Sequence, residues 1–268
     1  MEPHPVDASG RLSLRPIDPP QPQSYASRSS CPKLLREELL TQSPPARPEA
    51  ISHRGAHDSL PENSIPAFEE AIALGADAIE LDVHATSDGV VIVHHDETLR
   101  GSPKRRIAEI TAEELKRFPL AAGVEIPTLV EVFAAIGQRA FVYVEIKARD
   151  IEPLVVRCIR EAGSMCAVHS FDHRIVKNVK AIFPAIPTGV LEVARHVDPV
   201  AALVAAGARD LWQEASFIDE DLVVRAHAAR GRVIAWTADD AEQWKTLTEM
   251  GVDGICTNRI GPLATQSR

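Results

Sequence analysis

Carboxylates recur at close spacing in two apolar runs of this sequence. The run Ala78–Val83 carries Glu80 and Asp82, and the later run Phe141–Lys147 carries Glu145. Residues two apart on a β-strand project to the same face, so Glu80 and Asp82 should lie side by side. Two inward carboxylates repel each other and are costly to bury unless a cation lies between them. With Glu145 as a third oxygen ligand, the pattern predicts one divalent metal ion, Mg²⁺ or Ca²⁺.

Two histidines at the ends of apolar runs, His53 and His95, are the predicted catalytic residues. Two histidines can divide the roles of general base and general acid near neutral pH. His94 alternates to the opposite face from His95, and we assign it a structural role. Three further histidines are weaker candidates: His57, His84 and His169.

Local positive charge accompanies these groups at Arg54 and Lys147. An arginine can hold two phosphate oxygens at once and a lysine acts as a point charge, so both are predicted to bind an anionic substrate. The alternative is an ion-pair network with the carboxylates. Trp236 is predicted at the rim, where its indole would pack on the carbon part of the substrate, although a core position fits its type almost as well.

The elements that must position these residues begin near residue 49. Eight β-rich runs alternate with helical patterns: Ile51–Arg54, Ala78–Val83, Phe141–Lys147, Cys166–Phe171, Ile186–Glu192, Arg209–Glu214, Arg232–Thr237 and Val252–Thr257. Ser64, Thr111 and Thr128 have the spacing of helix N-caps. The alternation predicts an α/β protein, a (β/α)₈ TIM barrel over residues 49–268, whose active site lies at the carboxyl ends of the strands. A doubly wound open sheet is the alternative fold.

One segment breaks the alternation. Ser87-Asp88-Gly89 lies between two apolar runs and predicts a hairpin, so residues 84–127 are expected to be an insertion after strand 2. About ten residues follow the last run, which is short for a closing helix. A helix at Leu34–Leu40 is a hypothesis for filling that gap.

Composition bounds the remaining possibilities. The first 48 residues hold 10 of the 20 prolines and predict a flexible extension. The net charge of -9 argues against a nucleic-acid partner, and no apolar run is long enough to cross a membrane. The four cysteines show no disulfide or zinc spacing. Without a leader pattern at its start, the protein is expected to be cytoplasmic; its oligomeric state is left open.

Taken in order, these blocks resemble the glycerophosphodiester phosphodiesterase family from about residue 51 to residue 262. The blocks that carry the resemblance are His53-Arg54-Gly55, Pro61-Glu62-Asn63-Ser64, Ala67-Phe68, Glu80-Leu81-Asp82-Val83, Thr86-Ser87-Asp88-Gly89, His95-Asp96, Ile126-Pro127-Thr128-Leu129, Glu145-Ile146-Lys147, Ser170-Phe171, Trp236-Thr237 and Asp253-Gly254-Ile255. The resemblance implies the barrel with its insertion, and the same metal-binding, acid–base and phosphate-binding residues. Three positions depart from the family pattern: Ser64 for Thr, Asn258 for Asp, and His94 for an apolar residue.

The expected reaction is metal-dependent hydrolysis of a small-molecule glycerophosphodiester to sn-glycerol 3-phosphate and an alcohol. Either water or the glycerol 2-hydroxyl could be the nucleophile, and either histidine could be the base. A lysophospholipase D-like or sugar-phosphodiester enzyme on the same barrel is the alternative. A non-catalytic phosphodiester-binding barrel and a Schiff-base aldolase using Lys147 are more remote.

Overall fold

The computed structural model describes residues 47–99 and 105–266, all of which lie in one unit, Pro44–Arg268. Most of the predicted extension over residues 1–48, and the hypothetical helix at Leu34–Leu40, lie outside the described residues. Among the described helices, none is long and apolar enough to cross a membrane.

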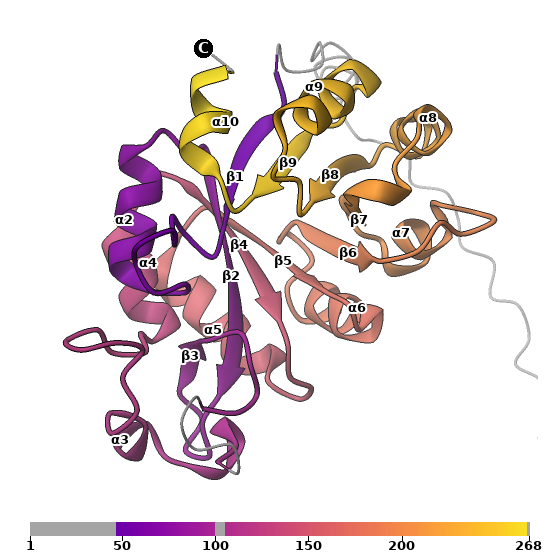
Figure 1. Cartoon of the computed structure of the whole chain (residues 1–268). Helices are drawn as coiled ribbons and strands as arrows, with labels where there is room; N and C mark the ends of the chain where they lie inside the picture. Colours follow the sequence, from indigo (N-terminus) through magenta and orange to yellow (C-terminus); the bar gives the residue numbers. More distant parts are fainter. Residues whose placement is uncertain (1–46, 100–104, 267–268) are drawn as a thin grey trace, which may run out of the picture. The chain divides into compact units, whose positions relative to one another are not determined.

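Eight parallel strands of the described chain close into a barrel (Figure 1). They are β1 (Glu49–His53), β2 (Ala78–Ala85), β4 (Phe141–Ile146), β5 (Cys166–Ser170), β6 (Thr188–Glu192), β7 (Asp210–Glu214), β8 (Arg232–Trp236) and β9 (Gly254–Thr257). Each strand pairs with the next along the chain, and β1 pairs with both β2 and β9. This closure confirms the predicted (β/α)₈ barrel and excludes an open sheet.

The predicted strand bounds differ from the observed ones by one or two residues. The sixth run, predicted from Ile186, begins as a strand only at Thr188. Pro187 precedes it and has no N–H to donate to the sheet, although its carbonyl accepts a bond from Val168.

Helices cover the outside of the barrel and begin at the caps that the sequence predicts. Ser64, Thr111 and Thr128 each accept a hydrogen bond from the first turn of the following helix, and the latter two form complete capping boxes. The helical segments are α2 (Ile65–Ala73), η1 (Ile107–Glu109), α3 (Ala112–Leu115), α4 (Leu129–Ile136), α5 (Glu152–Ala162), α6 (His173–Ile182), α7 (Ala201–Ala206), η2 (Ala215–Phe217), α8 (Glu220–Ala228), α9 (Ala241–Met250) and α10 (Ile260–Gln266).

A short helix follows the last strand. The short segment after β9 forms α10, which buries Ile260 and Leu263 and contacts β1. A helix of seven residues therefore packs against β1 next to the seam with β9.

The predicted hairpin is confirmed. The strand β3 (Val91–Val93) turns back from β2 and pairs with it in antiparallel fashion, outside the barrel wall. The inserted segment has a small core of its own, formed by Ile92, Leu99, Ile107, Ile110 and Leu115.

Inside the barrel, large side chains fill the space beneath the carboxyl ends of the strands. Trp212 is 1% exposed, and its ring packs edge-on against Tyr143 with 4.9 Å between the centroids. Gly189 on the neighbouring strand makes room for Trp212, because a Cβ there would lie 2.8 Å from the indole. The barrel interior is thus filled by side chains, and the polar residues lie directly above this packed layer.

Candidate active site

The register of the barrel brings the predicted acidic residues together at one end. His53 on β1 pairs with Glu80 on β2, and Asp82 on β2 pairs with Glu145 on β4. Glu145 in turn pairs with His169 on β5. These five side chains therefore come from four adjacent strands, near the carboxyl ends where barrel enzymes hold their active sites.

A sharp turn after β1 aims Arg54 at this cluster. Arg54 has a φ of 58° and Gly55 a φ of 85°, both in the left-handed region. A Cβ at Gly55 would lie 2.8 Å from the backbone of Ala67, so the close approach of α2 also requires glycine. The strained turn places Arg54 Nε 3.1 Å from Asp82 Oδ2.

Three polar groups surround the fully buried Asp82. Asn63 Nδ2 donates a 2.8 Å hydrogen bond to Oδ2, and Lys147 Nζ lies 3.4 Å from Oδ1. Burial by itself would raise the pKa of Asp82, but the cations of Arg54 and Lys147 lower it to about 2. Asp82 is therefore an anion at neutral pH.

Lys147 is held in its charged form. Burial opposes the charge on Lys147, but Glu145 and Asp82 raise its pKa, which argues against a Schiff-base lysine.

Glu80 and Glu145 have fewer cations beside them than Asp82, although Lys147 Nζ also lies 3.0 Å from Glu145 Oε1. Burial and the charge of Asp82 raise the pKa of both Glu80 and Glu145 to about 7. Glu80 Oε2 and Asp82 Oδ1 are buried and accept no hydrogen bond within the described part of the chain. Asp82 Oδ1 has the ammonium of Lys147 at 3.4 Å but no hydrogen bond, and Glu80 Oε2 has, among the described residues, neither a hydrogen bond nor a lysine or arginine beside it. Two such oxygens fit a divalent cation, which would supply further positive charge.

His169 is more central than its rank in the sequence suggested. Together with Glu80 and Glu145 it offers ligand atoms that lie within 4.8 Å of one another, a candidate metal site. Its ring stacks on Trp212 at 4.3 Å, and burial lowers its pKa to about 4. His169 lies two residues after Ala167 in β5, and both side chains point into the barrel. This alternation is a signal in the sequence that favours His169 as a site residue.

The two predicted catalytic histidines both line the pocket, from β1 and from the segment after β3. His53 Nε2 lies 4.0 Å from Glu80 Oε2, and its Nδ1 lies 2.7 Å from Asn258 Oδ1. His95 Nδ1 lies 2.7 Å from Asp96 Oδ1.

Two nearby histidines contact backbone rather than the pocket. His84 Nε2 lies 3.1 Å from the carbonyl oxygen of His95, and His94 Nδ1 lies 2.8 Å from that of Asp96. Both are buried, and their contacts fit supports for the segment that carries His95.

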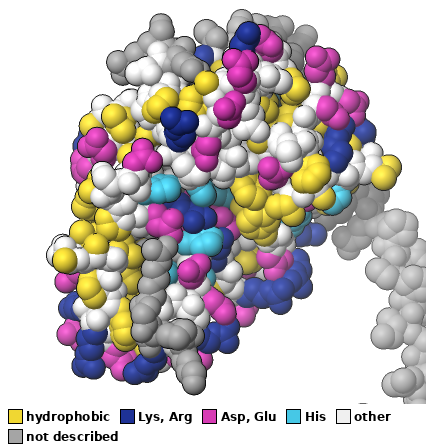
Figure 2. Space-filling view, viewed as in Figure 1, with side chains coloured by type: hydrophobic (Ala, Val, Ile, Leu, Met, Phe, Trp, Pro, Cys, Tyr) yellow, Lys and Arg dark blue, Asp and Glu magenta, His cyan; other side chains and the backbone are white. Residues whose placement is uncertain are grey.

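An apolar wall forms the other side of a cavity of about 230 Å³. Figure 2 shows histidine and charged side chains in a hollow, with hydrophobic side chains beside it. Trp236 lines this cavity, as the sequence predicts, and packs against Phe171 with 5.4 Å between the rings. Phe171 was not among the predicted site residues and is 43% exposed. Leu191 completes the apolar lining.

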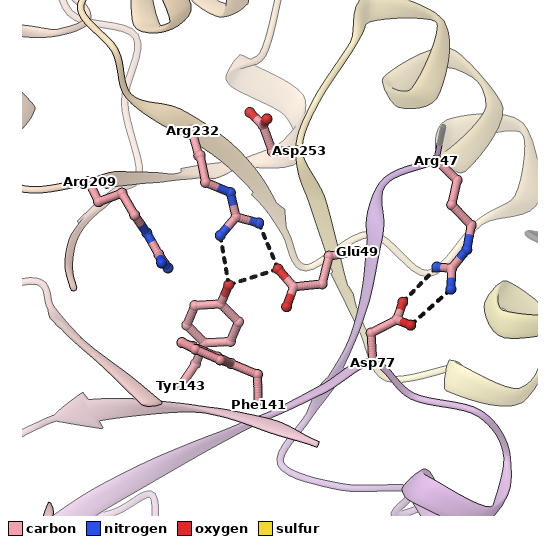
Figure 3. A pocket seen from close by; sticks show the side chains of 8 residues that line it. All are labelled: Arg47, Glu49, Asp77, Phe141, Tyr143, Arg209, Arg232 and Asp253. Atoms are coloured by element: carbon pink, nitrogen blue, oxygen red, sulfur yellow. Dashed lines mark hydrogen bonds and ion pairs between the residues drawn. The ribbon is translucent and has the colours of Figure 1, made fainter. Parts of the chain in front are cut away.

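A larger hollow of about 530 Å³ opens among residues at the amino ends of the strands (Figure 3). Its charged groups satisfy one another: Arg232 pairs with Glu49, and Arg209 donates two hydrogen bonds to the fully buried Asp210. Arg47 binds Asp77 in the same bidentate manner. Asp253 in turn contacts His227 and the backbone N–H of Val233, so the described charges of this hollow are paired with one another or with neighbouring groups. This end of a barrel ordinarily serves stability.

Comparison with known proteins identifies the class to which this barrel and site belong. Residues 53–262 match the model of the glycerophosphoryl diester phosphodiesterase family. A glycerophosphodiester phosphodiesterase of Caldanaerobacter subterraneus subsp. tengcongensis is 34% identical over 225 residues, which cover 78% of this chain and 93% of the relative. One from Bacillus altitudinis is 30% identical over the same shares of the two chains. The chain belongs to the glycerophosphoryl diester phosphodiesterase family, whose members hydrolyse glycerophosphodiesters.

Solved structures share the fold. A glycerophosphodiester phosphodiesterase of Parabacteroides distasonis aligns with a TM-score of 0.74 at 25% identity, covering 82% of this chain and 96% of that one. An Oleispira antarctica phosphodiesterase in complex with the product sn-glycerol-3-phosphate aligns with a TM-score of 0.75 at 24% identity, covering 82% and 97%.

Proposed function

We propose that this enzyme hydrolyses glycerophosphodiesters to sn-glycerol 3-phosphate and an alcohol, using one divalent cation and two histidines. The observation that carries the proposal is a pair of buried carboxylate oxygens, Glu80 Oε2 and Asp82 Oδ1, that accept no hydrogen bond from the described residues. They lie beside His53 and the side-chain cations of Arg54 and Lys147. A relative of the same fold, the Oleispira antarctica phosphodiesterase, was solved with sn-glycerol-3-phosphate as product, which supports the same product here.

Glu80, Asp82 and Glu145 are the proposed ligands of Mg²⁺ or Ca²⁺, because both cations prefer oxygen donors. When bound, the cation would polarise a phosphoryl oxygen as a Lewis acid. His169 is the competing third ligand, since it lies with Glu80 and Glu145 in the candidate cluster. Two variants distinguish these sets of ligands. Asp82→Asn should weaken Mg²⁺ binding if the ligands are Glu80, Asp82 and Glu145, and His169→Gln should weaken it if His169 is a ligand.

The side chains of this chain divide the remaining work. Arg54 and Lys147 bind the phosphoryl oxygens and offset the negative charge that builds up on them during reaction. One of His53 and His95 removes the proton of the nucleophile, and the other protonates the leaving alkoxide. The indole of Trp236 packs on the carbon part of the substrate.

The test is release of glycerol 3-phosphate from glycerophosphocholine and glycerophosphoethanolamine. EDTA should abolish the release, and added Mg²⁺ or Ca²⁺ should restore it. His53→Ala and His95→Ala should each lower kcat by about 10²–10⁴-fold, the usual contribution of an acid–base group. His227→Gln is the matched control, because His227 on α8 pairs with Asp253 at the amino ends of the strands, and neither lines the active-site cavity. Turnover that persists in EDTA would contradict the metal, and near-normal turnover in a histidine variant would remove that histidine.

The alternative substrate class is a lysophospholipid or sugar phosphodiester. The aromatic wall of Phe171 and Trp236 favours keeping a lipid in the comparison, because its exposed face could accept an alkyl chain. Lysophosphatidylcholine should therefore be assayed in parallel. A higher kcat/KM for this lipid than for glycerophosphocholine would replace the proposed substrate while leaving the reaction class intact.

A further inference from the structure

Asn258, just after β9, connects the half-buried carboxylate of Asp239 to two histidines. Its side-chain oxygen lies 2.7 Å from His53 Nδ1 and 3.0 Å from His57 Nε2. Its side-chain nitrogen donates a 2.7 Å hydrogen bond to Asp239 Oδ2. Its backbone N–H and the hydroxyl of Thr257 both donate to Asp239 Oδ1, at 2.8 and 2.9 Å.

These contacts allow only one orientation of the Asn258 amide. If the amide were flipped, its oxygen would face Asp239 Oδ2, and two oxygens that accept hydrogen bonds would lie against each other at 2.7 Å. The amide nitrogen must therefore point at Asp239, and the amide oxygen must point at the histidines. An amide oxygen only accepts hydrogen bonds, so His53 Nδ1 and His57 Nε2 must both carry protons.

The tautomer of His53 follows directly. A neutral imidazole carries one proton, and in His53 that proton lies on Nδ1. Its Nε2 is then the unprotonated nitrogen, and this is the atom that lies 4.0 Å from Glu80 Oε2 at the pocket.

We propose that Asn258 and Asp239 are positioning residues that hold His53 as the Nδ1–H tautomer, with Nε2 ready to accept a proton. The proposal rests on the proposed function in so far as it makes His53 the base and leaves His95 as the acid. Neither Asn258 nor Asp239 is among the residues that line the active-site cavity, so their effect passes through the imidazole of His53.

The hydrogen bond between Asn258 and Asp239 requires one amide and one carboxylate. A carboxylate at position 258 would face the carboxylate of Asp239 at hydrogen-bond distance, and the two charges would repel each other. Exchanging the two side chains keeps every hydrogen bond: an amide at position 239 donates to a carboxylate at position 258, which still accepts from His53. The exchanged pair is therefore a rescue that a purely structural role does not require.

The experiment uses the full chain and four variants: Asn258→Leu, Asn258→Asp, Asp239→Asn, and the double exchange Asn258→Asp with Asp239→Asn. Thr257→Val is the matched control, because it removes one hydrogen bond to Asp239 and leaves Asn258 in place. Two quantities are measured on each: kcat and KM for glycerophosphocholine, and the ¹⁵N chemical shifts of His53 Nδ1 and Nε2. The shifts report the tautomer without any need for activity, and the His53→Gln spectrum assigns them.

We expect Asn258→Leu to lower kcat by about 10- to 100-fold, the usual effect of losing a residue that orients an active-site imidazole, with KM nearly unchanged. The Nδ1–H signature should be lost in the same variant. Both single exchanges should lose turnover, the double exchange should recover most of it, and the control should behave as the unaltered enzyme.

Three results would overturn the proposal. One is an Asn258→Leu variant that keeps both its kcat and the Nδ1–H signature. Another is a spectrum of the unaltered protein with the His53 proton on Nε2. The last is a double exchange that recovers nothing although both single variants are folded and impaired. By contrast, normal turnover in His53→Ala would refute the catalytic role of His53, while the tautomer measurement would still decide the hydrogen-bond assignment.

Discussion

Replacing Glu80 by glutamine should make the cation-free protein more stable while abolishing its activity. Glu80 is 3% exposed, and burial with the charge of Asp82 raises its pKa from 4.5 to about 7. Each pKa unit corresponds to about 1.4 kcal/mol, so ionised Glu80 costs the folded state about 3 kcal/mol. Glutamine has nearly the shape of the protonated acid and does not carry this cost.

The sign of the effect depends on pH. Below pH 4.5 the carboxyl is protonated in both the folded and the unfolded chain, and the two proteins should be equally stable. The cost grows between pH 4.5 and 7 and is complete above pH 7. At pH 8 in EDTA we therefore expect Glu80→Gln to raise the free energy of unfolding by about 3 kcal/mol, equivalent to about 6–12 °C in Tm for a domain of this size.

Chemical denaturation at pH 8 and at pH 4.5, each with EDTA, measures the difference. Glu70→Gln on the exposed face of α2 is the matched control and should change neither value. Saturating Mg²⁺ should then stabilise the unaltered protein, by about 2.7 kcal/mol at a hundredfold excess over Kd, and the variant much less. A variant that is equally or less stable than the unaltered protein at pH 8 would refute the reasoning, because Glu80 would then be compensated within the fold.

Two further predictions follow from the buried charges. Cation binding near pH 6 should release protons, because Glu80 and Glu145 have pKa values raised to about 7 and must lose their protons to become ligands; calorimetry in buffers of different ionisation enthalpy measures this release, and a buffer-independent binding enthalpy would contradict it. At the opposite end of the barrel, Arg209→Met should lower the free energy of unfolding by about 3 kcal/mol, because it takes a bidentate partner from fully buried Asp210. Arg139→Met removes an equally bidentate but exposed pair and should cost under about 1 kcal/mol in the same denaturation experiment.

Much of the architecture could be predicted because local rules determine it. The N-caps at Thr111 and Thr128 depend on hydrogen bonds within one helical turn, and both capping boxes form as the spacing predicts. The hairpin at Ser87-Asp88-Gly89 is equally local, and its two strands pair as expected. The length after the last strand predicts no full closing helix, and the segment forms one of seven residues, which burial of Ile260 and Leu263 stabilises.

The positions of the site carboxylates follow from local rules, but their charge states do not. Glu80 and Asp82 share a face because a strand alternates with period two, which the sequence alone states. Their different charge states could not be predicted, because they depend on which cations the fold brings near. Arg54 and Lys147 both lie beside Asp82, whereas Glu80 has a buried oxygen with no hydrogen-bond donor.

Strand alternation and capping act over a few residues, so the sequence predicts which chemical groups the chain carries and near which strand end each of them lies. Which of these groups meet depends on the closed barrel. His169 joins Glu80 and Glu145, and Asn258 reaches His53 across 205 positions of sequence, because closure of the barrel sets the register between strands distant in the chain. Distances between side chains on different strands follow from that closure, and no local pattern encodes them.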